Sequence, residues 1–211
     1  MALPNPGMVF TAFDPLPAAS LNDIVENVEA LAAGTGLNDS IITASKIDFT
    51  TGIWWKEIGR STLTVAGDTM TVSSLPSYKY IKIMTQATGT DGLGMKLRFN
   101  NDSGNNYSFT QSIKFGAATD SISQSGIDIV GTVSSHPLFG TAEIVNISGF
   151  NKRVIATATN DGGSGASAVP SAPRYTYGKW ESTNVANSIS IVNTGNGDYA
   201  IGSELVVLGH N

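Results

Sequence analysis

The sequence contains no cysteine and only two histidines among its 211 residues. Disulfide bonds, thiolate metal sites and cysteine nucleophiles are therefore excluded. Charged residues make up 14% of the chain, against roughly 25% in an average globular domain. The formal net charge is −5 and the basic residues are dispersed. We therefore expect no nucleic-acid partner, because phosphate contacts need a basic surface.

Long apolar runs and a targeting signal are also missing. No stretch approaches 18 consecutive apolar residues, so we expect no membrane insertion. The first residues, MALPNP, have neither the basic n-region nor the apolar h-region of a signal peptide. We therefore expect synthesis in the cytoplasm without an export signal.

What the chain does contain is many small polar residues together with an ordinary apolar content. Hydrophobic residues account for 41% of the chain and glycine for 23 residues. Disorder requires low hydrophobicity or high net charge, and neither is present. Short strands that bury one face, joined by Gly, Asn and Ser turns, reconcile the two features. The composition thus predicts a β-rich globular protein.

The N-terminal part differs from the rest. Residues 1–20 are punctuated by proline, which predicts an extended arm. Ser20 is a suitable N-cap for a short helix that ends at Gly34 or Gly36. The helix places four aliphatic residues at heptad spacing: Leu21, Ile24, Val28 and Leu31. Residues 1–36 are thus expected to form an arm and helix, and residues 37–53 a connector.

A helix of about 13 residues is marginal in water on its own, so its apolar stripe needs a partner surface. Three partners are open: other copies of the helix in a short bundle, the chain's own β domain, or a different protein. Two heptads fall short of the three or four that identify a coiled coil. We expect self-association, with the four aliphatic residues as the oligomerisation seam.

From residue 54 onward the apolar residues recur with a period of two. Met95, Leu97 and Phe99 alternate with Lys96 and Arg98, the pattern of a half-buried strand. The same alternation is seen at Met70/Val72, Ile81/Ile83, Tyr107/Phe109, Ile127/Ile129 and Val145/Ile147, and four further strands are expected around 154–159, 174–181, 188–193 and 205–208. We therefore predict a mainly β fold, an antiparallel β-sandwich or jelly roll over residues 54–211, preceded by the arm and one short α-helix.

The sequence offers little for catalysis. His136 lies in a turn-like Ser-Ser-His-Pro segment, His210 is the penultimate residue, and no G-x-S-x-G motif is present. Most acidic residues are in predicted turns or in the helix. Asp128, Glu143, Glu181 and Glu204 are in predicted strands and could pair in space, but their outward-facing position on a strand is the simpler interpretation. We expect no enzymatic activity and no cofactor. One loop alternates oxygen donors at Asn100, Asp102 and Asn106, a weak candidate for calcium, but with one carboxylate it is more typical of a hairpin turn.

Aromatic residues are the candidates for ligand contact, because exposed rings can stack on sugars. Core packing is the alternative role for most of them. The strip that follows the Gly/Ser-rich segment 161–168 is the first place to look for an exposed contact. The candidate residues are Trp54, Trp55, Tyr107, Arg174, Tyr175 and Tyr177.

Several segments resemble tailed-bacteriophage virion structural proteins. Residues 3–36 contain the opening LPNPGM and the helix LNDIVENVE, and the ending AGTGL extends to Leu37. These segments are similar to the start of phage fibre and minor structural proteins. Residues 42–49, ITASKIDF, resemble the (I/V)T-x-x-K-(I/L) linkers of phage fibres. Residues 98–107 and 201–210 resemble phage β domains.

This resemblance implies a homotrimer, with an N-terminal part that binds other virion proteins and a C-terminal β domain that faces outward. It implies a short fibre or spike knob that attaches to a host-surface glycan or protein, located on the virion. The alternative is an architectural head-fibre, capsid-decoration or tail/baseplate adaptor protein that binds only other virion proteins. A third hypothesis, a polysaccharide depolymerase, would need paired acids in one groove.

Overall fold

The computed structural model divides the chain into two compact units, Met1–Thr51 and Gly52–Asn211. All residues that it describes belong to the second unit: 55–89, 91–133, 137–160, 170 and 173–211. The predicted arm, connector and helix, with the seam of Leu21, Ile24, Val28 and Leu31, therefore lie outside the described residues, as do Trp54 and His136.

The described residues form twelve strands and no helix, which confirms the mainly β prediction. The strands are β1 (Lys56–Thr62), β2 (Thr69–Val72), β3 (Tyr80–Ala87), β4 (Leu93–Phe99), β5 (Tyr107–Ile113), β6 (Thr119–Gln124), β7 (Ile127–Val133), β8 (Leu138–Val145), β9 (Lys152–Asn160), β10 (Arg174–Trp180), β11 (Ile189–Val192) and β12 (Glu204–His210).

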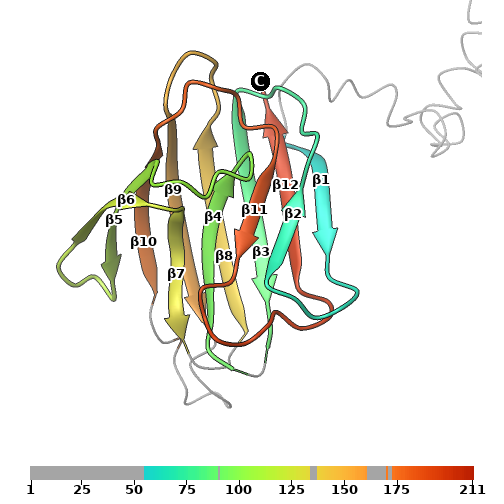
Figure 1. Cartoon of the computed structure of the whole chain (residues 1–211), viewed down its shortest axis with the longest axis vertical. Coiled ribbons are helices and arrows are strands. Elements are labelled where there is room, and N and C mark those ends of the chain that lie inside the picture. Colours follow the sequence, from blue (N-terminus) through green and yellow to red (C-terminus); the bar gives the residue numbers. More distant parts are fainter. Residues whose placement is uncertain (1–54, 90, 134–136, 161–169, 171–172) are drawn as a thin grey trace, which may run out of the picture. The chain divides into compact units, whose positions relative to one another are not determined.

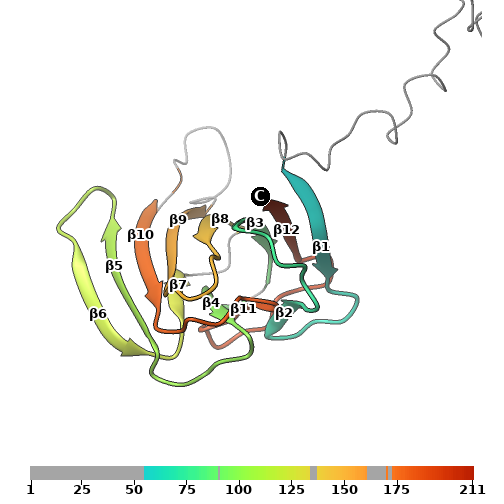
Figure 2. The same cartoon turned by 90° about the horizontal axis from the view of Figure 1, so that it is seen from above.

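The strands build two antiparallel sheets that face one another (Figures 1 and 2). The large sheet has the order β1-β12-β3-β8-β9-β10-β5-β6, and the small sheet the order β2-β11-β4-β7. The chain crosses repeatedly from one sheet to the other. When β1, β12 and the β8–β9 hairpin are set aside, β2-β11-β4-β7 faces β3-β10-β5-β6, which is the strand order of a jelly roll.

The core lies between the sheets and consists of alternate residues from both. In β4, Leu93, Met95, Leu97 and Phe99 are fully buried while the intervening Lys96 and Arg98 are only partly covered. Strand β9 alternates strictly, with every second residue from Lys152 to Asn160 buried and those between exposed or partly so. The period-two pattern thus arises because one face of each strand packs against the opposite sheet.

Two details of the strand prediction were wrong. In β8 the buried set is Leu138, Gly140, Ala142 and Ile144, whereas Val145 is 36% exposed and Ile147 lies beyond the strand. The apolar pair that indicated this strand therefore faces outward. Strands β1 and β6 were not predicted, because each is an edge strand with no fully buried residue and no apolar alternation to reveal it.

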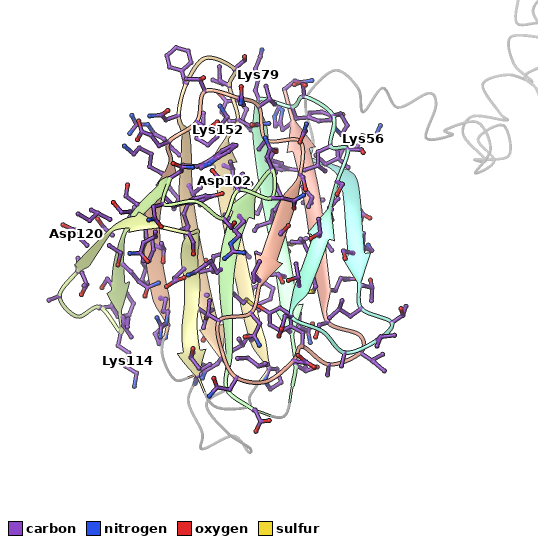
Figure 3. The ribbon with its side chains drawn as sticks, in the orientation of Figure 1. Lys56, Lys79, Asp102, Lys114, Asp120 and Lys152 are labelled. Atoms are coloured by element: carbon purple, nitrogen blue, oxygen red, sulfur yellow. The ribbon has the colours of Figure 1, made fainter. Side chains whose placement is uncertain are left out.

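Lys152 is a lysine whose side chain is fully buried at one end of the core, near the top of the sandwich in Figure 3. Its Nζ donates hydrogen bonds to the carbonyl oxygens of Ile147 (2.8 Å), Phe150 (2.5 Å) and Thr183 (3.4 Å). Three backbone acceptors in two loops are therefore satisfied by one ammonium group. Burial lowers the pKa of Lys152.

We expect Lys152→Met to lower the free energy of unfolding by about 2 kcal/mol, because the apolar stem is kept while the carbonyls lose a charged donor. Chemical denaturation at neutral pH measures the change. Lys79→Met is the matched control: Lys79 is exposed, and its loss should change stability by less than about 0.5 kcal/mol. Equal stability of the two variants would contradict the role assigned to Lys152.

Candidate functional site

The outer face of the large sheet carries side chains that line up across neighbouring strands. Tyr80 on β3 is opposite Val145 on β8, Val145 is opposite Arg153 on β9, and Arg153 is opposite Lys179 on β10. The adjacent row, from β3 to β6, contains Lys82, Glu143, Ile155, Tyr177, Thr110 and Asp120. Cross-strand neighbours on one face are close enough to act together.

Apart from Lys82, the residues of these two rows line an open groove of about 800 Å³ on this face. At one end are Trp55, which precedes β1, and His210 at the end of β12; at the other are Asp120 and Ile122 of β6. Strand β6 pairs only with β5 and buries no residue, so it extends past the sandwich as a wall of the groove. Its pairing shifts near Ser123, whose φ is 53°, and such irregularities redirect side chains.

The groove is rich in exposed apolar surface. Tyr177 is 58% exposed, Ile155 55%, Tyr80 43% and Ile122 74%. Large apolar side chains gathered on one face of a protein mark an interaction site more often than scattered ones do. The sheet holds these four residues in place through backbone hydrogen bonds, so a ligand meets a preformed surface.

An aromatic group closes the end of the groove near the C-terminus. The His210 ring lies edge-on to Trp55, with ring centroids 5.6 Å apart, and edge-on to Tyr80 at 6.3 Å. The Nδ1 atom of His210 is buried and has no hydrogen-bond partner among the described residues. This end of the groove therefore offers a ligand both aromatic surface and one nitrogen atom that is free to form a hydrogen bond.

Most charged groups of the groove have partners. Lys82 Nζ lies 3.3 Å from Glu143 Oε1, and Asp120 Oδ1 accepts a 2.6 Å hydrogen bond from the Thr110 hydroxyl. Glu143 and Asp120 are the two acids of the groove, and four strand spacings, about 19 Å along the sheet, separate β8 from β6. Paired acids in glycoside hydrolysis lie less than about 10 Å apart. These two carboxylates are thus placed for binding rather than for joint acid–base chemistry.

Two of the predicted contact residues line the groove. Trp55 is at its end and Tyr177 near its middle. Tyr175 is on the same face of β10, but it lies outside the groove, where its ring contacts that of Phe115 with centroids 5.3 Å apart.

The prediction for Tyr107 was wrong, because its side chain is 1% exposed. Its ring stacks with those of Phe99 and Trp180, and its hydroxyl accepts a hydrogen bond from the Phe99 amide at 3.0 Å and donates to the Asp102 carbonyl at 3.1 Å. Burial raises the pKa of Tyr107 to about 12. Tyr107 is a core residue that anchors the turn after β4.

The prediction for Arg174 was also wrong. Arg174 is on the inward face of β10, together with the buried Thr176, and is only partly exposed. Its Nη1 donates to Gln111 Oε1 at 2.8 Å, and Gln111 Nε2 donates to the backbone carbonyl of Asp128 on β7. Arg174 therefore belongs to a polar network that joins the two sheets and does not face the groove.

The loop considered for calcium uses its oxygen atoms for internal hydrogen bonds. Asp102 accepts from the Gly104 amide at 2.9 Å, from Asn106 Nδ2 at 2.9 Å and from Trp180 Nε1 at 2.7 Å. Asn100 Oδ1 accepts from two backbone amides, those of Asn187 and Ser188. These hydrogen bonds make the segment a structural turn, but the hairpin interpretation was wrong, because β4 and β5 belong to different sheets and do not pair. Among the described residues no group of three or more His, Cys, Asp or Glu side chains is placed to hold a metal.

Sequence reasoning missed Tyr80, Arg153, Ile155, Lys179 and His210 as groove residues. The strict alternation of residues 152–160 identifies the exposed face of β9, and could have indicated Arg153 and Ile155. Which residues of other strands stand beside them depends on register, which no local pattern contains.

Comparison with protein-family models, with curated proteins and with solved structures finds no match to this chain. Within the described ranges, no helix is long and apolar enough to cross a membrane.

The hydrogen bonds to the Asp102 carboxylate make the stability of the fold depend on pH. Desolvation raises the pKa of this carboxyl group, but the hydrogen bonds from Trp180, Asn106 and Gly104 together outweigh it and hold the pKa below its usual value. A carboxyl group with a lowered pKa stabilises the fold above its unfolded pKa of about 3.9, and that contribution is lost as the pH falls through the folded pKa.

We therefore expect Asp102→Asn to lower the free energy of unfolding by about 1–2 kcal/mol at pH 7 and to reduce its fall in acid. Denaturation curves between pH 7 and pH 2.5 measure both effects. Asp91→Asn, at an exposed aspartate of the β3–β4 turn, is the control and should follow the wild-type profile. If the free energy of unfolding of Asp102→Asn falls with pH as steeply as that of the wild type, the role assigned to the Asp102 carboxylate is contradicted.

Proposed function

We propose that this protein is a tailed-bacteriophage virion structural protein, a trimeric short fibre or spike knob, and that its β domain attaches to the host surface by binding a glycan in the outer-face groove. The groove is the observation that carries the proposal. It brings Trp55, Tyr80 and Tyr177 to one open surface with hydrogen-bonding groups between them. Sugars are bound by this combination, because rings cover their C–H faces and polar groups meet their hydroxyls.

The shape of the surface suits attachment. An open groove on a rigid sheet binds a polymer without enclosing it, so the affinity of each site is expected to be modest. Three copies in one knob, and several knobs on one particle, would raise the overall avidity by about 10²–10⁴ without any new contact. Weak binding at each site lets a particle move over the host surface. Simultaneous binding at many sites then holds the particle in place.

The second candidate is an architectural role, in which the domain binds another virion protein. The tip of the β5–β6 hairpin favours it. Lys114 and Phe115 have φ values of 51° and 58°, a conformation that costs about 1–2 kcal/mol for such residues, and Phe115 is 78% exposed. The two residues are the central pair of a hairpin turn closed by the Gly116 amide and the Ile113 carbonyl, and the turn leaves the Phe115 ring available to a protein partner.

Tyr177→Ala tests the proposed function. We expect it to weaken binding to the recognised bacterial surface polysaccharide five- to thirtyfold, about 1–2 kcal/mol, because a central stacking surface is removed. The probe is a panel of purified capsular, O-antigen and teichoic polysaccharides, with titration of those bound by the full chain. Tyr175→Ala is the matched control, since Tyr175 is two residues away on the same face but outside the groove.

Binding of polysaccharide that is equally weakened by the two substitutions would contradict the groove as the site. Binding to purified capsid or tail protein, with no polysaccharide bound, would favour the architectural role instead.

The proposed trimer has its own test. Light scattering of the full chain at micromolar concentration should give three times the chain mass of 22.0 kDa. Ile24→Asp places a charge in the predicted seam and should give a monomer, with the far-UV signal of the β domain retained. A monomeric wild-type chain would contradict the oligomer.

A further inference from the structure

The middle of the groove contains two positively charged side chains in direct opposition. Arg153 on β9 and Lys179 on β10 are register partners, and both line the groove. Directly opposed residues on one face have Cβ atoms about 4.5–5.5 Å apart, and like charges in such positions repel. The fold gains nothing from this pairing, so its presence needs another explanation.

Of the two cations, only Lys179 has an acidic partner. Glu181 uses one carboxylate oxygen for Lys179 and the other for the side-chain amide of Asn151. Glu143, the acid of the neighbouring row on β8, pairs with Lys82 on its far side. Arg153 is exposed, and within the described part of the chain it has no ion pair or side-chain hydrogen bond. It is therefore a guanidinium group with all its donors available.

Apolar surface surrounds this pair. Val145 is opposite Arg153 on the other side, Tyr80 follows Val145 in the same row, and Tyr177 precedes Lys179 by two residues on the same strand. A guanidinium presents a planar set of donors that matches a carboxylate or phosphate in two parallel hydrogen bonds. The surroundings thus suit a ligand that offers an anionic group and a ring face together.

We infer that the glycan of the proposed function is an acidic one, whose carboxylate or phosphate group is bound by Arg153 with Lys179 beside it. This inference rests on the proposed function, because it specifies the ligand class of the same groove. From β12 to β6 the groove crosses six strand spacings, about 29 Å, so it accommodates several sugar units of an extended polymer. Arg153 and Lys179 lie near the middle of that length.

The charge of the groove argues for an acidic glycan over a nucleic acid. Nucleic acids carry a phosphate at every residue and are bound by lines of basic side chains. Here Glu143 and Asp120 are in the row next to the cationic pair, and would oppose a polymer charged at every unit. In a glycan with neutral sugars between acidic ones, the acidic sugars can bind the cationic pair while neutral sugars lie beside the carboxylates.

The test compares Arg153→Gln with Lys82→Gln in the full chain. Arg153 lines the groove, whereas Lys82 lies on the same face outside the groove lining and already has an acidic partner in Glu143. The probes are a uronate-containing capsular polysaccharide, a phosphate-containing teichoic acid, a neutral dextran and single-stranded DNA, each titrated calorimetrically at two salt concentrations. Unchanged thermal unfolding of each variant shows that the fold is intact.

We expect one of the two acidic polymers to bind. Binding of the uronate polysaccharide identifies a carboxylate as the recognised group, and binding of the teichoic acid identifies a phosphate. Arg153→Gln should weaken that binding tenfold or more and reduce its salt dependence, while Lys82→Gln should change it less than threefold. Equal binding of the neutral dextran, or binding that Arg153→Gln leaves unchanged, would overturn this inference while Tyr177→Ala still supported the proposed function. Binding of single-stranded DNA that matches the acidic polysaccharides would also overturn it. No binding of any polysaccharide would overturn both.

Discussion

The structure depends on the burial of alternate residues between two sheets of unequal width. Eight strands face four: β2 of the small sheet packs against β1 and β12, β7 packs against β9, β10 and β5, and β6 lies beyond this contact. Each strand has two faces, and the core takes one of them. The large sheet therefore keeps a broad, regular outer face, and the overhanging strand gives that face a wall. The groove follows from the mismatch in strand number.

That origin explains why the groove is suited to binding. Its side chains come from seven strands whose spacing is fixed by hydrogen bonds, so little conformational entropy is lost when a ligand arrives. Polar side chains hold the loops at the end of the sandwich. The Lys152 ammonium group donates hydrogen bonds to three backbone carbonyls, and the Trp180 indole N–H on β10 donates one to the Asp102 carboxylate. The contact with Trp180 fixes the end of β10, one residue from Lys179 and three from Tyr177, and so connects the core to the groove.

Strands could be predicted from the sequence where one face of the strand is buried and the other exposed. They could not be predicted where neither face is fully buried. Met95, Leu97 and Phe99 alternate because one face of β4 is buried, and the predicted β-sandwich is confirmed on such strands. The edge strands β1 and β6 bury no residue completely and gave no pattern. Val145 was a misleading guide in β8, because an apolar residue on the outer face resembles a core residue. The groove itself was only partly predictable. Tyr177 was found from its exposed aromatic strip, whereas the opposition of Arg153 and Lys179 arises from the register of two strands that are separated by a long connection.

The central claim is that the outer face of the large sheet is the ligand-binding surface. Amide chemical-shift mapping during titration with the bacterial surface polysaccharide that the full chain retains tests it most directly. The account predicts that the shifts concentrate in β3, β8, β9 and β10, at the positions that line the groove. Shifts concentrated in the small sheet, in β2, β11, β4 and β7, would contradict it.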